Sequence, residues 1–195
     1  MSLARKGAAV FLDRDGTLVR EVTHLWHVDQ MEILPGVATA LRLLRGHGFK
    51  LVMVTNQSVV ARGRLEEAGL QAIHAELLAR LARDGAALDA IYYCPHHPTE
   101  GIGNYRIACD CRKPKTGMID RAVRELGLDP TASYVIGDQM TDVELAARVG
   151  ATAILIGAAE AAPNNSEFNL PVFADLSCAA EWIVTRLHSL TPGAG

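Results

Sequence analysis

Two aspartates lie two positions apart directly after a short apolar run near the start of the chain. The run 8–12 (AAVFL) leads into Asp13, and Asp15 follows after one residue. Alternate side chains of an extended chain share a face, so both carboxylates can point into one pocket. One can attack phosphorus as a nucleophile, while the other gives a proton to the leaving oxygen and later takes one from water. The pair therefore indicates group-transfer chemistry with two carboxylates.

Further polar groups of matching chemistry follow later in the chain. Asp138 and Asp142 add two carboxylates, and so much negative charge in one place requires a cation. Mg²⁺ prefers a few carboxylates together with water and phosphate oxygens. The hydroxyl of Thr55 and the ammonium of Lys113 suit a phosphoryl oxygen, and the metal and the lysine would balance charge in the transition state. These residue types predict a magnesium-dependent phosphoryl-transfer site.

The elements that must position these residues follow from the apolar pattern. Continuous apolar runs predict strands at 8–12, 50–56, 88–94, 133–137 and 152–156. Helical spacing, with Thr or Gly at several ends, predicts helices at 37–48, 65–85, 116–128, 141–150 and 177–190. This alternation predicts an α/β fold with a parallel sheet and helices on both faces.

In such sheets ligands bind beyond the carboxyl ends of the strands. Asp13 follows the first predicted strand, Thr55 and Asn56 end the second, and Asp138 follows the fourth. Three polar clusters that are far apart in the sequence are therefore expected at one edge of the sheet. Each cluster alone also has a structural interpretation, because carboxylates near turns and polar residues that close strands are common.

Length and composition set the class of protein. The chain has 195 residues, 49% of them apolar and 21% charged, with a net charge of −3. We expect one domain over 1–195 with flexible tails at both ends. The charge disfavours nucleic acid and acidic membrane surfaces as partners. No apolar run reaches the roughly 18 residues of a membrane span, so we expect a cytoplasmic protein. We also expect it to be a monomer that acts on a small-molecule substrate.

The segment 94–114, which fits neither helix nor strand, has the spacing of a metal site. Cys94 and His96 form one close pair, and Cys109 and Cys111 form a second after twelve intervening residues. Two such pairs suit tetrahedral Zn²⁺, which would supply the order that packing cannot. His97 is the rival ligand to His96. Free or buried cysteines, or a disulfide, are the alternatives to zinc.

Four motifs in sequence order resemble the signature of the haloacid dehalogenase (HAD) superfamily of phosphohydrolases. They are DRDGT, TNQS, RKP and GDQMTD, within residues 11–142. The resemblance implies a Rossmann-like core and an aspartyl-phosphate intermediate. It implies the following roles: Asp13 as nucleophile and Mg²⁺ ligand, Asp15 as general acid/base with its carbonyl on Mg²⁺, Thr55 and Lys113 on the phosphoryl group, Asp138 as a metal ligand, and Asp142 in support of the metal or Lys113.

The cysteine loop narrows this resemblance to a subgroup without a large cap domain. CPHHP and CDCRKP are similar to the zinc-loop subgroup that contains heptose 1,7-bisphosphate phosphatases and histidinol-phosphate phosphatases. It implies a structural zinc, and specificity set by a flap at 20–35, by the zinc loop and by Arg112. The guanidinium of Arg112 fits a second phosphate or a carboxylate. A sugar bisphosphate is the expected substrate, with histidinol phosphate or another small sugar phosphate as its rival. The alternative hypothesis, in which the chain is not an enzyme, is a zinc-stabilised binding module.

Some positions depart from the subgroup where substrate would be held. The stretch 21–27 lacks the Gly-Tyr-Val that follows an acidic residue in the heptose enzymes. Val59 replaces a glycine, and Gln139 stands where some relatives carry lysine. Trp26, His24 and His27 can stack on or hydrogen-bond a sugar, or Trp26 can simply pack the flap onto the body. We assign Asn56 and Gln139 to the substrate site as well. Cys178, on the last predicted helix, is expected in the core.

Overall fold

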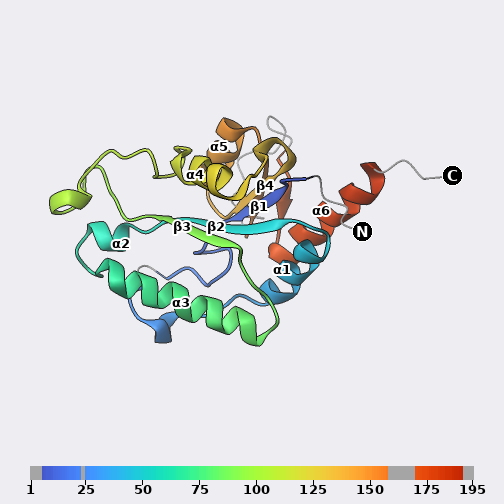
Figure 1. Ribbon diagram of the computed structural model, residues 1–195. Helices are drawn as coiled ribbons and strands as arrows, with labels where there is room; N and C mark the ends of the chain where they lie inside the picture. Colours follow the sequence, from blue (N-terminus) through green and yellow to red (C-terminus); the bar gives the residue numbers. More distant parts are fainter. Residues whose placement is uncertain (1–5, 23–24, 158–169, 191–195) are drawn as a thin grey trace.

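One six-stranded parallel sheet forms the centre of the molecule (Figure 1). The structure is a computed structural model, and it describes residues 6–22, 25–157 and 170–190. The strands are β1 (Ala9–Leu12), β2 (Lys50–Asn56), β3 (Ala90–Cys94), β4 (Tyr134–Gly137), β5 (Thr152–Ile156) and β6 (Val172–Phe173). Their order in the sheet is β3-β2-β1-β4-β5-β6. β1 therefore lies between β2 and β4, and all three end at the same edge.

Helices cover both faces of this sheet, as predicted. They are α1 (Val37–Gly46), α2 (Ser58–Ala61), α3 (Glu67–Arg83), α4 (Gly117–Leu126), α5 (Met140–Val149) and α6 (Leu176–Leu190). Three short 3-10 helices are η1 (Val28–Gln30), η2 (Gly103–Tyr105) and η3 (Pro130–Ala132). In Figure 1, α4 and α5 lie above the sheet, while α1 and α3 lie below it. The predicted α/β architecture is confirmed.

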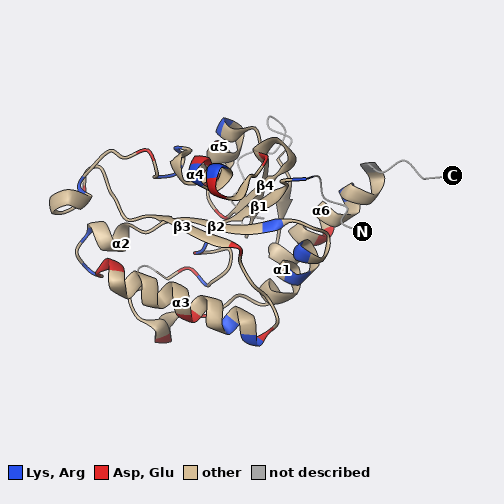
Figure 2. Cartoon of the chain, in the orientation of Figure 1, with Lys and Arg blue, Asp and Glu red and all other residues tan. Residues whose placement is uncertain are grey.

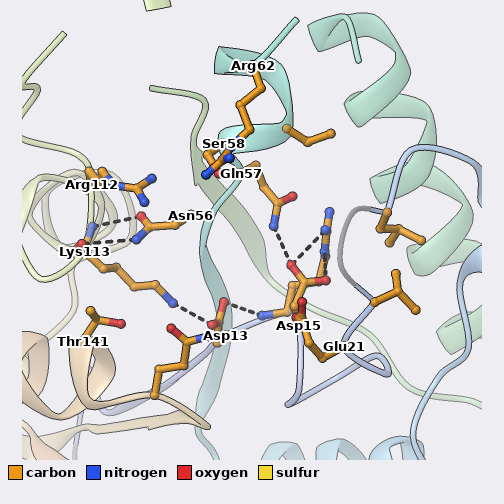
Figure 3. Close-up of a pocket in the computed structure, with 15 residues that line it drawn as sticks. Asp13, Asp15, Glu21, Asn56, Gln57, Ser58, Arg62, Arg112, Lys113 and Thr141 are labelled. Carbon is orange, nitrogen blue, oxygen red and sulfur yellow. Dashed lines mark hydrogen bonds and ion pairs between the residues drawn. The ribbon is translucent and has the colours of Figure 1, made fainter. Parts of the chain in front are cut away.

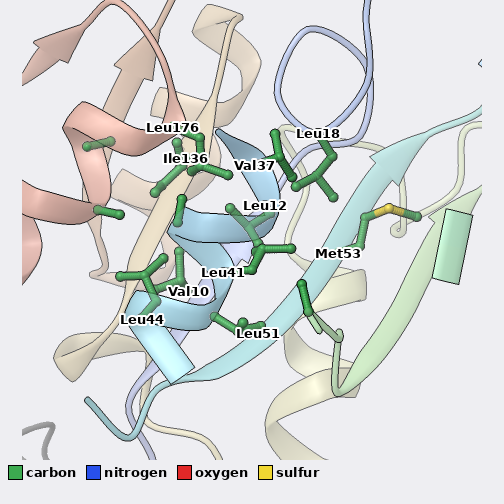
Figure 4. Close-up of a cluster of buried hydrophobic side chains, with 14 of the residues drawn as sticks. Val10, Leu12, Leu18, Val37, Leu41, Leu44, Leu51, Met53, Ile136 and Leu176 are labelled. Atoms are coloured by element: carbon green, nitrogen blue, oxygen red, sulfur yellow. The ribbon is translucent and has the colours of Figure 1, made fainter. Parts of the chain in front are cut away.

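The first strand shows why its sequence is apolar at every position. Val10 and Leu12 pack into the cluster under α1 and α6, whereas Ala9 and Phe11 pack into the cluster under α4 and α5. All four side chains are fully buried. Figure 4 shows the first cluster, in which Leu41 of α1 lies among these strand residues. Burying one such large aliphatic side chain contributes about 1.5–3 kcal/mol, so the strand that carries Asp13 is firmly held.

Charged residues are spread over the helices rather than gathered on one element (Figure 2). α3 illustrates their arrangement, with Glu67 in its first turn and Arg80 and Arg83 in its last. This order complements the helix dipole, which favours negative charge at the N-terminus and positive charge at the C-terminus. Of the helices described, none is long and apolar enough to cross a membrane.

The structure also departs from the predicted elements. β6 and α2 were not predicted, because runs of two and four residues are too short to show a period. α5 begins at Met140 after Gln139, one residue before the predicted start at Thr141. The prediction that Cys178 is a core residue is wrong. Cys178 is exposed, because α6 turns Leu176 and Ala179 inward instead.

Within the described residues, the flap at 20–35 and the segment 94–114 contain few regular elements, chiefly the short 3-10 helices η1 and η2, and are held largely by other contacts. In the flap at 20–35, Val19 and Ile33 form an antiparallel bridge, and the exposed Arg20 and Glu32 form an ion pair. In the segment 94–114, Cys94 ends β3 and the rest contains only the short η2. The predicted flexible tails at 1–5 and 191–195, and His24, lie outside the described residues.

Candidate active site

The aspartate at the end of β1 occupies the centre of the sheet edge. Its backbone N–H donates to the carbonyl of Ile136 at 3.0 Å, which continues the pairing of β1 with β4 by one residue. Gly16 then turns the chain at φ +71°, where a Cβ would overlap the carboxylate of Asp138. A larger residue at position 16 would therefore separate the two acidic loops. The glycine brings the end of β1 against the end of β4.

Lys113 joins two of the predicted acidic residues. Its Nζ lies 2.9 Å from Oδ2 of Asp13 and 2.7 Å from Oδ1 of Asp142. The lysine is 4% exposed. Burial by itself lowers the pKa of Lys113, but the charges of Asp13 and Asp142 outweigh this effect and raise it. The ammonium is therefore charged, and it lies directly beside the predicted nucleophile (Figure 3).

Asp138 adds a third carboxylate to the two that pair with Lys113. Oxygens of Asp13, Asp138 and Asp142 all lie within 4.8 Å of one another. Burial, and then the charge of Asp13, raise the pKa of Asp138 to about 6. Burial likewise raises the pKa of Asp142 to about 6, against the opposing effect of Lys113. Oδ1 of Asp138 and Oδ2 of Asp142 are buried without a hydrogen-bond partner among the described residues.

These two oxygens and the excess of negative charge meet the requirements of a hard divalent cation. Mg²⁺ takes oxygen ligands and keeps positions for water and phosphate. The donor set is all carboxylate, so the site fits Mg²⁺ better than a metal that prefers sulfur or imidazole. The side chain of Asp15 does not join this group of three.

Asp15 instead faces its own set of donors. Nε and Nη2 of Arg14 donate to its two oxygens at 3.0 and 2.9 Å, and Nε2 of Gln57 donates to Oδ2 at 2.8 Å. Gln57 also donates to the hydroxyl of Thr55 at 2.8 Å. Asp13 and Asp15 both line one pocket, as their spacing predicts. Thr55 is 1% exposed and is not among the residues that line it.

Asn56 holds the backbone of Lys113. Its side-chain oxygen accepts from the Lys113 N–H at 2.9 Å, and its amide nitrogen donates to the Lys113 carbonyl at 3.2 Å. Asn56 also lines the pocket. Its amide therefore fixes the loop that carries the lysine, a contact between positions 57 residues apart.

The pocket above these residues has a volume of about 430 Å³. Arg62, Arg112 and Gln139 lie around it, and Nη1 of Arg112 donates to the carbonyl of His96 at 3.1 Å. Burial, followed by the charges of Asp15, Asp138 and Asp13, raises the pKa of Glu21 to about 7. Glu21 therefore carries a proton for part of the time near neutral pH.

The flap reaches the pocket with other residues than the aromatic ones. Glu21, Val22 and Leu25 line it, whereas Trp26 is 44% exposed and lies outside the lining. His27 lies 3.1 Å from the exposed Asp29. Trp26 and His27 therefore do not line this pocket, while the packing role of Trp26 stays a prediction.

The cysteine loop folds into a cluster of four ligand atoms. Sγ of Cys94, Cys109 and Cys111 and a ring nitrogen of His96 all lie within 4.8 Å of one another. All three cysteines are free thiols, which excludes the disulfide alternative in this structure. Hydrogen bonds from its neighbours, chiefly Cys94, lower the pKa of Cys111 to about 5. A set of three sulfurs and one imidazole fits tetrahedral zinc.

His97 points away from this cluster. Its Nδ1 accepts from the backbone N–H of Glu100 at 3.0 Å, while Nδ1 of His96 lies 3.4 Å from the sulfur of Cys111. The choice left open between the two histidines is thus decided in favour of His96 as the member of the cluster.

Several residues of the site gave no clear signal in the sequence. Arg14, Ser58, Arg62 and Thr141 line the pocket, and Gln57 bridges Asp15 and Thr55. Gln57 had the most readable signal, because alternate residues of an extended chain share a face and it stands two positions after Thr55. A charged residue between two aspartates is typical of a solvent-exposed position, so the sequence does not predict that Arg14 is buried.

Comparison with known proteins places this geometry in a family. A family model described as HAD-hydrolase-like matches residues 110–176. The D-glycero-beta-D-manno-heptose-1,7-bisphosphate 7-phosphatase of Salmonella typhi is 38% identical over 189 residues, which are 96% of this chain and 95% of that protein. The chain belongs to this phosphatase family of the HAD superfamily. The family member from Haemophilus ducreyi is 46% identical over 143 residues, or 73% of this chain and 78% of that protein.

Solved structures of the HAD superfamily agree with the fold. The D,D-heptose 1,7-bisphosphate phosphatase of B. bronchiseptica, complexed with magnesium and phosphate, superposes with a TM-score of 0.78 at 30% identity. The alignment covers 92% of this chain and 99% of that one. A putative HAD-like phosphatase from Mesorhizobium loti gives a TM-score of 0.83 at 27% identity, covering 96% and 89% of the two chains. The predicted HAD-type Rossmann-like core is confirmed.

Proposed function

We propose that this chain is a magnesium-dependent phosphomonoesterase that removes the 7-phosphate from D-glycero-β-D-manno-heptose 1,7-bisphosphate. The observation that carries the proposal is the position of Lys113, buried between Asp13 and Asp142 at the centre of the sheet edge. This arrangement supports the proposal, because a carboxylate suited to attack, a fixed positive charge and further carboxylates that could bind a cation lie close together. The substrate comes from the names of relatives that match nearly the whole chain.

In the first half of the reaction, a carboxylate oxygen of Asp13 attacks phosphorus. The bond between phosphorus and the sugar oxygen breaks, its electron pair stays on that oxygen, and Asp15 gives the oxygen a proton. The products are the sugar with a free hydroxyl and a phosphoryl group on Asp13. Lys113 balances the negative charge of the transferring group from its place beside Asp13.

In the second half, Asp15 is a carboxylate and takes a proton from water. The water oxygen attacks phosphorus, and the bond between phosphorus and Asp13 breaks. Inorganic phosphate leaves, Asp13 is again a carboxylate, and Asp15 carries the proton needed for the next cycle. Thr55, held by Gln57, would contact the phosphoryl group after a small shift of that amide.

Asp13 and Asp138, with Asp142 in support and the carbonyl of Asp15, would hold the Mg²⁺. When bound, the ion would neutralise charge on the phosphoryl oxygens. The excess of carboxylates over ammonium, and the unpartnered oxygens of Asp138 and Asp142, support this assignment.

Arg112 and Gln139 would recognise the part of the substrate beyond the reacting phosphate. Arg112 is fixed by the carbonyl of His96, and it lies in the lining of the pocket. Zn²⁺ on Cys94, His96, Cys109 and Cys111 would be structural, because four protein ligands leave no open position. The ion would then hold the base of the loop that carries Arg112 and Lys113.

The test is hydrolysis of a panel of phosphate esters by the purified chain with Mg²⁺. Heptose 1,7-bisphosphate should be the best substrate, ahead of histidinol phosphate and simple sugar monophosphates. Asp13→Asn should abolish turnover without unfolding the chain, while Asp29→Asn, at an exposed position, should not change it. Faster turnover of histidinol phosphate would reassign the substrate. No hydrolysis of any ester would favour the non-catalytic binding module.

The proposal treats the chain as a single-domain cytoplasmic monomer. Clustered free thiols suit a reducing compartment. Light scattering after gel filtration tests the oligomeric state, and a mass near 20.9 kDa is expected.

A further inference from the structure

A buried arginine and a buried histidine lie behind Asp15. Arg14 is 1% exposed, and His74, on α3, is 5% exposed. Nη1 of Arg14 lies 3.4 Å from Nε2 of His74, while Nε and Nη2 of the same guanidinium donate to the Asp15 carboxylate. A guanidinium held on two sides cannot rotate freely. Arg14 therefore connects α3 to the second carboxylate of the site.

The partners of His74 define its protonation. A guanidinium only donates, so Nε2 of His74 must accept and the ring must be neutral, with its proton on Nδ1. Burial, and then the charge of Arg14, lower the pKa of His74 to about 3, in agreement with that form. The ring of Tyr93 packs against the imidazole, with 5.5 Å between the ring centroids. The Tyr93 hydroxyl donates to Oε2 of Glu67 at 3.0 Å. His74 is thus a fixed, neutral acceptor.

The hydrogen bonds of Asp15 restrict where its carboxyl group can carry a proton. An ionised carboxylate offers about four lone-pair positions, two on each oxygen. Arg14 takes one on each oxygen, and Gln57 takes a second on Oδ2. Among the contacts of the described residues, the remaining position is on Oδ1. A proton carried by Asp15 in this arrangement sits on Oδ1.

We propose that His74 is a positioning residue for proton transfer by Asp15, acting through Arg14. By holding Nη1 of Arg14, His74 fixes the rotation of the Asp15 carboxyl group and keeps Oδ1 as the oxygen that gives the proton. This inference rests on the proposed function in one respect, because it takes Asp15 as the group that protonates the leaving oxygen.

The proposal has a consequence that a purely structural role lacks. A sugar oxygen leaves poorly unless it is protonated as the bond breaks, whereas nitrophenolate leaves without a proton. Since kcat/KM covers the steps up to the first irreversible one, it depends on the acid only for the sugar ester. A displaced Asp15 should therefore lower kcat/KM for the sugar phosphate and spare p-nitrophenyl phosphate.

The experiment compares three variants on heptose 1,7-bisphosphate and p-nitrophenyl phosphate. His74→Leu removes the acceptor, His74→Gln keeps an oxygen that can accept from Arg14, and Tyr93→Phe keeps the packing ring as a matched control. His74→Leu should lower kcat/KM for the sugar ester about ten- to a hundredfold, as small misplacements of catalytic groups do. Its kcat/KM for p-nitrophenyl phosphate should stay within about twofold of wild type. His74→Gln should recover most of the loss, and Tyr93→Phe should show none.

Equal losses on both substrates, no loss on either, or a Gln variant with the same ratio as the Leu variant would each overturn the proposal. Should His74→Leu not fold, His74→Met gives the same test, because a thioether fills the buried site but accepts a hydrogen bond from Arg14 only weakly. The outcome is separate from that of the proposed function. If the wild type does not hydrolyse the heptose ester, the best sugar phosphate of the panel replaces it, and the ratio still decides the role of His74.

Discussion

Replacing Lys113 with methionine tests the electrostatics of the site directly. Its Nζ lies 2.9 Å from Asp13 and 2.7 Å from Asp142, and each ion pair gives about 6 kcal/mol of attraction at an effective dielectric constant of about 20. The cost of burying the ammonium offsets much of this gain. Removing one partner of a buried ionic group typically costs about 3–5 kcal/mol, because the other charges stay behind unpaired.

We therefore expect Lys113→Met to lower the free energy of unfolding by about 3–5 kcal/mol at pH 8, or Tm by roughly 10 °C for a chain of this size. Lys50→Met is the matched control. Lys50 is 54% exposed at its side chain and pairs with Asp89, which also keeps Arg45 as a partner. Its loss should cost no more than about 1 kcal/mol.

The deficit of Lys113→Met should shrink as the pH falls from 8 to 5. The pKa values of Asp138 and Asp142 are already raised to about 6, and loss of the lysine that lowers both would raise them further. A carboxyl group whose pKa is higher in the folded than in the unfolded state takes up protons on folding, so its contribution to stability is present at low pH and lost as the pH rises. The variant should thus recover stability at pH 5 relative to wild type.

Urea unfolding of the three proteins at pH 5, 6.5 and 8, without added magnesium, measures these differences. The same preparations should show a loss of turnover of about a hundredfold or more for Lys113→Met, since a buried charge beside the transferring group is gone. A deficit no larger than that of Lys50→Met, or one that grows toward pH 5, would refute the electrostatic account of the site.

Three further predictions concern other parts of the molecule. Cys109→Ser should lower the bound zinc and loosen 94–114 in hydrogen exchange, whereas Cys178→Ser, at an exposed thiol, should not; equal zinc contents would contradict the cluster assignment. Arg112→Ala should reduce kcat/KM more for a sugar bisphosphate than for the corresponding monophosphate, by about tenfold if one charge-assisted contact is lost; equal losses would deny it recognition. The neutral His74 should make stability fall as the pH drops from 6.5 toward 3, because the unfolded chain takes up a proton there that the folded chain refuses. Urea unfolding at pH 7, 5.5 and 4.5 measures how the free energy of unfolding changes with pH. His74→Gln should reduce this change, and His188→Gln, on an exposed helix face, should not. The same pH dependence in all three proteins would place the acid sensitivity elsewhere.

Much of this molecule could be read along the chain. The strands are continuous apolar runs because both faces of a parallel sheet are buried, and β2 and β5 have the predicted bounds. Motifs at strand ends indicated the site. Asp13, Thr55 and Asp138 lie at the ends of neighbouring parallel strands, and these ends share one edge of the sheet. Spacing alone also indicated the four members of the cysteine–histidine cluster, apart from the choice between His96 and His97.

Tertiary structure decided what depends on side-chain direction between distant segments. Asn56 reads as a substrate-binding residue, but its amide holds the Lys113 backbone. Arg14 and His74 are separated by 60 positions, and only the packing of α3 against the end of β1 buries them together. A linear pattern records which residues share a face of one element, and it does not record which elements meet. Local motifs therefore indicated which side chains could react. Which buried partners hold those side chains in place was decided by the tertiary structure.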